Sequence, residues 1–425
     1  MGDSGISEIP KKCKACVIID EGPDFRVEVQ DVDVPEPAYG QLLLKLNCTG
    51  LCGSDIHYCL GDLGIGPSAF GVRSPGHEGA GVVAKLGPGV TGWKVGDRAG
   101  VKPMWDVCHN CELCWTGQEQ YCAKVIHTGM MTAGTYQQYI LSPAIYTSRI
   151  PDGVPDEVAG PIMCSASTMH RAIKDSGLVS GDWVVFPGGG GGVGIQGVQL
   201  ASIMGMRPIV IDSGDEKRKL VLEHGGEVFI DFKEVTDVAA KIKETADGIG
   251  AHGVLVTAWQ SYKDSMSYLG DRVGGKVVCI GIPPKDMNLT IAGSPYHMIS
   301  NRVSITGSKV GTMKDTEATL EYARRGLLKP IHEVRGLSQW AESVQQLKEG
   351  KVAGRIVSFV VVSGLATANY VRSSHSTKNS MIQYTSVYSV SPLSFATQFR
   401  SFRLIPVLDS SFPANSPVTQ HAKGL

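Results

Sequence analysis

The chain has 425 residues, more than a single hydrophobic core of ordinary size supports, so two or three domains are expected. Hydrophobic residues make up 42% of the sequence and charged residues 19%, as in many globular proteins. The formal net charge of −1 provides no general attraction for nucleic acid or for an anionic membrane. We therefore predict neither as a partner.

The beginning of the chain carries no recognisable targeting signal. The first thirty residues lack the continuous apolar core of a signal peptide, and no later run reaches the roughly 18 to 20 apolar residues of a membrane span. We therefore predict a cytoplasmic protein. In that reducing compartment, the clustering of the 11 cysteines favours metal binding over disulfides.

Residues 14–160 predict an irregular, mostly β domain. They are rich in Gly and Pro, contain short strand-like pieces such as residues 42–46, and show little helical periodicity. Loops of such a domain are the natural place for binding and catalytic residues.

A group of closely spaced cysteines predicts a structural zinc site. Four soft thiolates on one loop suit a closed tetrahedral site. An iron–sulfur cluster is the alternative, but in ferredoxins the fourth cysteine follows sooner and precedes Pro, whereas Ala123 stands here. Unliganded thiols are the remaining possibility. The four cysteines are Cys108, Cys111, Cys114 and Cys122.

From about residue 183 to 307, β-branched runs alternate with helical stretches. This alternation predicts a parallel, doubly wound α/β sheet of six strands with both faces covered. The predicted strands include residues 184–186, 209–211, 228–230, 254–256, 276–280 and 304–306.

A glycine-rich turn follows the first of these strands and precedes a helical stretch. The spacing Gly189-x-Gly191-x-x-Gly194, with Gly192 inside it, brings a backbone and a helix N-terminus against a pyrophosphate. Asp212 ends the next strand, where its carboxylate suits the hydroxyls of an adenosine ribose and repels a 2′-phosphate. We therefore predict NAD rather than NADP, with Lys217 as a further contact to the ribose.

Residues 361–425 form a Ser-rich tail without a sustained period, and they do not read as a domain. Two interpretations stay open, namely a disordered extension and translated sequence that does not belong to the mature protein.

Three parts of the sequence together carry a family resemblance, namely the segment from Gly76 to Gly81, Cys52 with residues 53–57, and Cys164. They resemble the zinc-containing medium-chain alcohol dehydrogenases, especially the fungal and yeast type. The similarity runs from about residue 17 to 357. It implies a GroES-like catalytic domain over residues 1–164, a Rossmann domain over 165–311, and a return segment over 312–360 that completes the catalytic domain.

The resemblance also implies a catalytic zinc, so that two Zn²⁺ are expected per chain. Cys52, His77 and Cys164 would hold this metal, with Glu78 as an exchangeable ligand and an open fourth position for substrate. Asp55 would fix the tautomer of His77.

The implied reaction transfers hydride between a primary alcohol and NAD. Ser54 and His57 would relay the alcohol proton through the cofactor ribose, while Thr168 and Val193 would pack behind the nicotinamide ring. The family commonly forms dimers or tetramers, so a homo-oligomer is expected.

Three positions depart from the pattern of the yeast enzymes. Gly53 stands where many relatives place a cationic contact to the pyrophosphate, which predicts faster cofactor release. Leu63 and Pro103 replace tryptophans, which predicts a wider pocket for alcohols bulkier than ethanol.

Two other functions compete with this one. Polyol dehydrogenases share the stretch from Cys52 to Tyr58 but generally place Glu near the position of Cys164. A catalytically silent relative that binds dinucleotide would be expected to lose zinc ligands, and this chain has all of them.

Overall fold

A computed structural model of the chain describes residues 8–291, 293–329 and 331–360. The predicted Ser-rich tail, residues 361–425, lies outside the described residues. Among the helices that are described, none combines the length and the apolar character that a membrane crossing requires.

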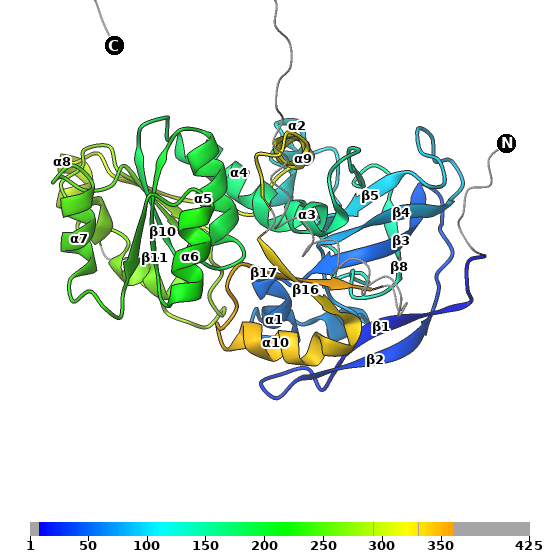
Figure 1. The fold of residues 1–425 in the computed structure, drawn as a ribbon. Coiled ribbons are helices and arrows are strands. Elements are labelled where there is room, and N and C mark those ends of the chain that lie inside the picture. The colour runs from blue at the N-terminus through cyan, green and yellow to red at the C-terminus, as the bar shows by residue number, and fades with distance from the viewer. Residues whose placement is uncertain (1–7, 292, 330, 361–425) are drawn as a thin grey trace, which may run out of the picture. The chain divides into compact units, whose positions relative to one another are not determined.

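A mixed sheet is built from strands at both ends of the described chain (Figure 1). Its long strand β3 (Gln41–Gly50) pairs antiparallel with β4 (Gly79–Leu86), with β8 (Tyr139–Pro143) and, at its end, with β17 (Arg355–Phe359). The remaining strands of this sheet are β5 (Arg98–Val101), β9 (Ser148–Arg149) and β16 (His332–Gly336). There are also two small two-stranded sheets among the described residues. One pairs β1 (Lys12–Ile19) with β2 (Arg26–Asp33), and the other pairs β6 (Met104–Asp106) with β7 (Ile126–His127).

The leucines of β3 explain why this strand lies inside the molecule. Successive side chains of a strand point to opposite faces, so an uninterrupted apolar run buries both. Leu42 and Leu44 belong to a core that includes Trp340, whereas Leu43 packs in a separate cluster with Tyr139. The mostly β character expected of residues 14–160 is confirmed.

The second large sheet has six parallel strands in the order β12-β11-β10-β13-β14-β15. This confirms the predicted doubly wound α/β sheet and each of its predicted strands. The strands are β10 (Trp183–Pro187), β11 (Arg207–Asp212), β12 (Val228–Asp231), β13 (Gly253–Val256), β14 (Lys276–Cys279) and β15 (Ser304–Gly307).

Helices cover both faces of the parallel sheet (Figure 1). Alternate residues of β10 enter different cores, because Val184 and Phe186 pack in one cluster and Val185 in the other. The helices around the two sheets are α1 (Gly53–Leu60), α2 (Glu112–Trp115), α3 (Asp156–Pro161), α4 (Ser167–Ser176), α5 (Gly194–Ile203), α6 (Asp215–Glu223), α7 (Val238–Thr245), α8 (Pro295–Ser300), α9 (Met313–Arg324) and α10 (Trp340–Lys348).

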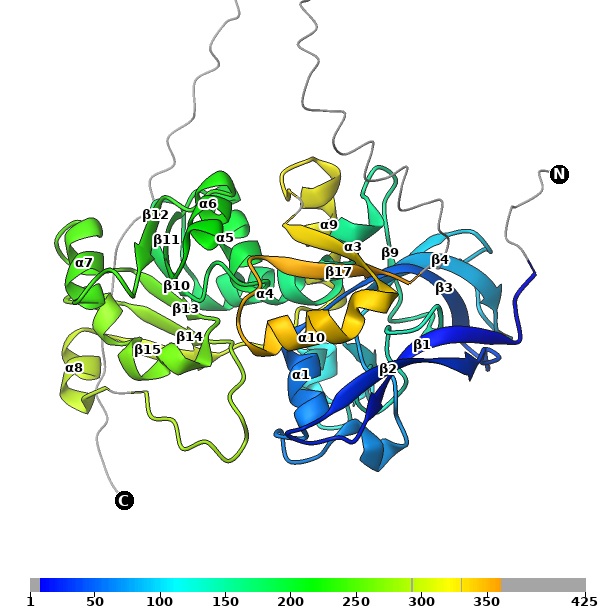
Figure 2. The ribbon, with the colours of Figure 1, turned by 60° about the horizontal axis from the view of Figure 1, so that its bottom comes forward.

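The returning chain brings the two sheets into contact at the glycine-rich turn. Gly354 forms a bridge with Gly191, and its N–H donates to the carbonyl of Gly190 at 2.9 Å. Figure 2 shows β17 and α10 beside α1 at this border. The first residue of β17 is therefore held next to the turn predicted to bind a dinucleotide.

Gly81 provides a test of how closely β3 and β4 pack. A Cβ atom at this position would lie 2.1 Å from the carbonyl oxygen of Lys45 and 2.7 Å from the Cα atom of Leu46, which are backbone atoms. Gly81→Ala should therefore lower the free energy of unfolding by about 1–3 kcal/mol, the usual effect of overpacking, and lower Tm with it.

Gly307→Ala is the matched control, because Gly307 is also a strand glycine and its Cβ would meet nothing within 4 Å. Thermal unfolding of both variants checks the prediction. A Tm loss of similar size in the two variants would contradict it.

Candidate functional site

Two thiols, an imidazole and a carboxylate converge in the interior at the end of β3. One potential ligand atom from each of Cys52, His77, Glu78 and Cys164 lies within 4.8 Å of the others, and all four residues are buried. Cys52 immediately precedes α1, His77 and Glu78 lead into β4, and Cys164 lies in the π-helical turn Ile162–Ala166. The structure thus brings together the complete set that the resemblance implied.

Asp55 holds the orientation of the imidazole. One carboxylate oxygen lies 2.9 Å from Nδ1 of His77, and the other accepts hydrogen bonds from the hydroxyl of Tyr136 at 2.5 Å and from the N–H of Cys52 at 3.1 Å. Asp55 is 1% exposed. With Nδ1 facing Asp55, Nε2 of His77 faces the thiols, where Ser54 Oγ lies 3.4 Å away.

Glu78 is fully buried and lies next to a cation that the sequence prediction missed. Its Oε1 is 3.3 Å from Nη2 of Arg355, yet neither carboxylate oxygen accepts a well-aligned hydrogen bond from any described residue. Burial raises the pKa of Glu78 to about 8, and the positive charge of Arg355 opposes this rise. A buried carboxylate with free acceptor capacity is suited to a metal.

One sequence signal could have pointed to Arg355, because it is a cation at the start of a mostly apolar strand. Its guanidinium donates to the carbonyl of Leu51 at 2.8 Å, and its Nε lies 2.7 Å from where a Cβ of Gly192 would stand. The same side chain therefore touches the surroundings of both Glu78 and the glycine-rich turn.

The donor set fits a zinc ion. The pKa of Cys52 lies well below its usual value, first because the thiol of Cys164 donates to its sulfur and then because Arg355 and His77 add positive charge. Buried anionic sulfurs need a compensating cation. Two sulfurs and one imidazole nitrogen are typical protein ligands of a catalytic zinc, which keeps a further position open.

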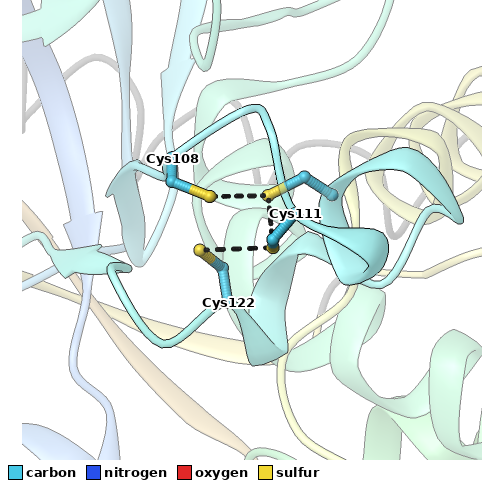
Figure 3. A group of neighbouring side chains, drawn as sticks. Cys108, Cys111 and Cys122 are labelled. Atoms are coloured by element: carbon cyan, nitrogen blue, oxygen red, sulfur yellow. Dashed lines mark hydrogen bonds between the residues drawn. The ribbon is translucent and has the colours of Figure 1, made fainter.

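The four-cysteine loop forms a second ligand set (Figure 3). The sulfur of Cys111 is 3.5 Å from that of Cys114 and 4.0 Å from that of Cys122, while Cys108 and Cys114 are separated by 3.9 Å. A tetrahedron with Zn–S bonds of about 2.3 Å places its sulfurs about 3.8 Å apart. These four sulfurs are therefore already spaced for a closed zinc site.

The glycine-rich turn has the close packing that its spacing predicted. A Cβ at Gly189 would lie 2.7 Å from Val210, and a Cβ at Gly194 would lie 2.4 Å from the carbonyl oxygen of Gly188. Gly191 and Gly192 line the small cavity beside Arg355. The turn leads directly into α5, and Val193 and Gly194 at the start of this helix also line the cavity. A helix N-terminus is a favourable place for a phosphate group.

Asp212 lies at the end of β11 and anchors the same turn. Its carboxylate accepts from the N–H of Gly190 at 3.0 Å and pairs with Nζ of Lys217 at 2.8 Å. Both side chains line a groove of 960 Å³ that also includes Gly188 and Gly192. The two residues predicted to contact the ribose are thus adjacent to the predicted pyrophosphate site.

The remaining predicted residues surround these two sites. Ser54 Oγ donates to the sulfur of Cys52 at 3.3 Å, while His57, in the last turn of α1, contacts Asp62 at 2.8 Å. Val193 lines the cavity beside Arg355. Thr168 is buried in α4, shortly after Cys164, and is not among the residues that line this cavity.

Comparisons with known proteins agree with this architecture. Residues 38–152 match the family model "Alcohol dehydrogenase GroES-like domain", and residues 192–325 match "Zinc-binding dehydrogenase". An alcohol dehydrogenase of Schizosaccharomyces pombe is 39% identical over 351 residues, which is 82% of this chain and 98% of that protein. The chain belongs to the zinc-containing medium-chain alcohol dehydrogenase family.

Other members of the family are similar over comparable lengths. An alcohol dehydrogenase of Geobacillus stearothermophilus is 35% identical over 331 residues, covering 78% of this chain and 95% of that protein. The solved cinnamyl alcohol dehydrogenase of Sorghum bicolor superposes with a TM-score of 0.72 at 25% identity, covering 84% of this chain and 99% of the other. The predicted family is therefore confirmed, and the chain is a zinc-dependent alcohol oxidoreductase that acts on small molecules.

Removing one cysteine from each ligand set should separate the two zinc sites. Cys111→Ser should lower the zinc content by about one ion per chain and lower Tm, because the four-cysteine loop is otherwise held by few buried side chains. Cys52→Ala should also lose about one zinc but stay folded and inactive.

Three measurements on the same preparations check that one zinc site is structural and the other catalytic. They are elemental analysis, thermal unfolding and alcohol oxidation. An equal loss of folding in both variants would show that the two sites do not have separate structural and catalytic roles.

Proposed function

We propose that this chain interconverts primary alcohols and aldehydes by hydride transfer with NAD. The observation that carries the proposal is the position of Arg355, which lies against Glu78 of the ligand set and against Gly192 of the glycine-rich turn. The reacting centre and the predicted cofactor site thus lie within the reach of one side chain. A zinc bound by the buried set supplies a Lewis acid for the alcohol oxygen, and NAD supplies the hydride acceptor.

The buried set is assigned as the catalytic zinc site, with Cys52, His77 and Cys164 as ligands and Glu78 as an exchangeable ligand. Asp55 holds His77 in the tautomer whose Nε2 is free to ligate, because its carboxylate lies 2.9 Å from Nδ1. The four-cysteine loop is assigned to structural zinc. Its closed set of four sulfurs leaves no position for a substrate.

The cofactor is assigned as NAD on the basis of Asp212. A carboxylate at the end of β11 accepts hydrogen bonds from ribose hydroxyls and repels a phosphate on the same ribose. The solved acetophenone reductase of Geotrichum candidum, described in complex with NAD, shares the fold at 24% identity, a TM-score of 0.70 and coverage of 83% of this chain and 98% of the other. Lys217, paired with Asp212, is placed to contact the same ribose.

Ser54 and His57 are assigned to the path of the alcohol proton. Ser54 Oγ lies 3.3 Å from the sulfur of Cys52, so its hydroxyl is beside the position where an alcohol oxygen would bind. His57 lies one turn along α1 and is 18% exposed at its side chain, which lets it exchange a proton with water. Val193 and Thr168 remain assigned to the wall behind the nicotinamide ring.

The proposed organisation keeps the predicted boundaries, with a catalytic domain over residues 1–164 and 312–360 and a Rossmann domain over 165–311. The pairing of β17 with β3 supports the return of the chain to the catalytic part. The cytoplasmic location stays a prediction.

An alcohol panel tests the proposed reaction. Initial rates of NAD reduction should give a higher kcat/KM for hexanol and benzyl alcohol than for ethanol, because Leu63 and Pro103 replace the tryptophans of the yeast enzymes and a wider pocket is expected from this exchange. Xylitol and sorbitol should be poor substrates, and NADP should replace NAD weakly because of Asp212.

Each competing function has its own outcome in this panel. A preference for the polyols would establish a polyol dehydrogenase, and the absence of turnover in protein that contains about two zinc ions per chain would support a silent relative. A preference for ethanol would contradict the wider pocket.

We also propose that the chain forms a homo-oligomer through the edge of the six-stranded sheet. Strand β15 is the last strand of the sheet and is mostly exposed. Next to it in the chain, Tyr296 and Ile299 on α8 are 80% and 81% exposed. An open strand edge beside large exposed apolar side chains is a surface that a second copy can cover.

Ile299→Asp tests this surface. Light scattering after size exclusion should show a dimer or tetramer for the unmodified protein and a smaller species for the variant, because a buried unpaired carboxylate disfavours the interface. Ile145→Asp is the control, since Ile145 is 65% exposed and lies outside the six-stranded sheet. An unmodified protein that is monomeric, or an equal effect of both substitutions, would contradict the proposal.

A further inference from the structure

Helix α1 ends in a turn that folds the chain back onto its own last residues. Gly61 has φ +66°, and its N–H donates to the carbonyl of Tyr58 at 3.2 Å. In a continued helix, side chains five positions apart point about 140° away from each other. The left-handed conformation of Gly61, which is unfavourable for a residue with a Cβ, redirects the chain so that Asp62 can reach His57.

The contact between Asp62 and His57 has the geometry of an orienting hydrogen bond. Nδ1 of His57 lies 2.8 Å from one carboxylate oxygen of Asp62 and 3.0 Å from the other. Their side chains are 18% and 24% exposed, so the pair is shielded but open to water. Because an ionised carboxylate only accepts hydrogen bonds, this contact requires a proton on Nδ1.

The main chain of Asp62 is held from the other sheet. Its carbonyl accepts from the N–H of Lys285 at 2.8 Å, and the side chain of Lys285 lies over Gly64, with Nζ 2.7 Å from where a Cβ would stand. Lys285 belongs to the loop that follows β14 of the six-stranded sheet. One residue thus connects His57 to the sheet that carries the predicted cofactor site.

A carboxylate from the turn between β1 and β2 packs against the loop that follows α1. Glu21 accepts a hydrogen bond from the N–H of Ser68 at 3.0 Å and fills the space beside Gly66. It stabilises the loop, whereas Asp62 contacts the histidine. The two acids therefore offer a matched pair for experiments.

We propose that Asp62 is a positioning residue that holds His57 as its Nδ1–H tautomer, with the Lys285 contact setting the position of this pair relative to the cofactor sheet. The inference rests on the proposed relay, in which His57 accepts the alcohol proton. Nε2 is then the nitrogen with the free lone pair. A proton taken up there makes an imidazolium, which passes the proton on to water.

A double-mutant cycle tests this role. Asp62→Asn should lower kcat about tenfold in the unmodified enzyme, with KM for NAD changed by less than about twofold. In His57→Gln, which itself should be slow, adding Asp62→Asn should change kcat by less than about twofold, because the group that Asp62 positions is gone. Asp62→Glu keeps the carboxylate and should recover most of the rate.

Glu21→Gln is the control for damage to the loop and should leave kcat unchanged.

A second measurement of the role of Asp62 does not depend on turnover. Nitrogen NMR of histidine-labelled, zinc-loaded protein, with the His57 signal assigned by its loss in His57→Gln, should show the Nδ1–H tautomer and the loss of this preference in Asp62→Asn.

The outcomes distinguish the positioning role of Asp62 from the proton relay through His57 on which it rests. If His57→Gln is slow but Asp62→Asn lowers kcat equally in both backgrounds, or if the tautomer does not depend on Asp62, the positioning role is wrong and the relay stands. If His57→Gln retains the unmodified kcat, the relay itself is wrong.

Discussion

The buried ion pair between Glu78 and Arg355 is the contact on which the arrangement of the site depends. Glu78 comes directly before β4, and Arg355 begins β17, so the pair joins segments that are 277 residues apart in the chain. Removing one partner of such a pair leaves an uncompensated buried charge, which costs about 3–5 kcal/mol. The guanidinium is further satisfied by the carbonyl of Leu51. The returning strand is thereby held with its cation at the border of both sites.

Charge balance explains why this interior suits a metal. Cys52 carries a sulfur with a lowered pKa, and Asp55 and Glu78 are buried beside it. Asp55 contacts the imidazole of His77, and Arg355 is the cation that pairs with Glu78. Such an interior favours the binding of a divalent cation, because the negative charges of the ligands then face a positive charge instead of one another. The protein therefore prepares the metal site by placing a buried thiolate beside Glu78, whose carboxylate oxygens accept no hydrogen bond from the described residues.

Features of short range in the chain were predictable from residues alone. The four-cysteine loop, the glycine-rich turn and Asp212 at the end of the following strand all depend on local spacing. In the structure the four cysteines lie together, and Asp212 accepts a hydrogen bond from the glycine-rich turn. The six parallel strands followed from β-branched runs between helices, since burial on both faces demands such runs. The gathering of Cys52, His77 and Cys164 had no local signal and was expected only from family resemblance.

The sequence by itself thus determined the six-stranded parallel sheet, the mostly β character of residues 14–160, the four-cysteine loop, the glycine-rich turn and the residue types available for chemistry, because these depend on neighbours in the chain. Only the tertiary structure decided that Arg355 lies between Glu78 and Gly192, since this follows from the pairing of β17 with β3. It likewise decided that Asp62 faces His57, which depends on the left-handed conformation of Gly61. Contacts between distant segments arise from the packing of whole sheets, and no spacing in the chain encodes them.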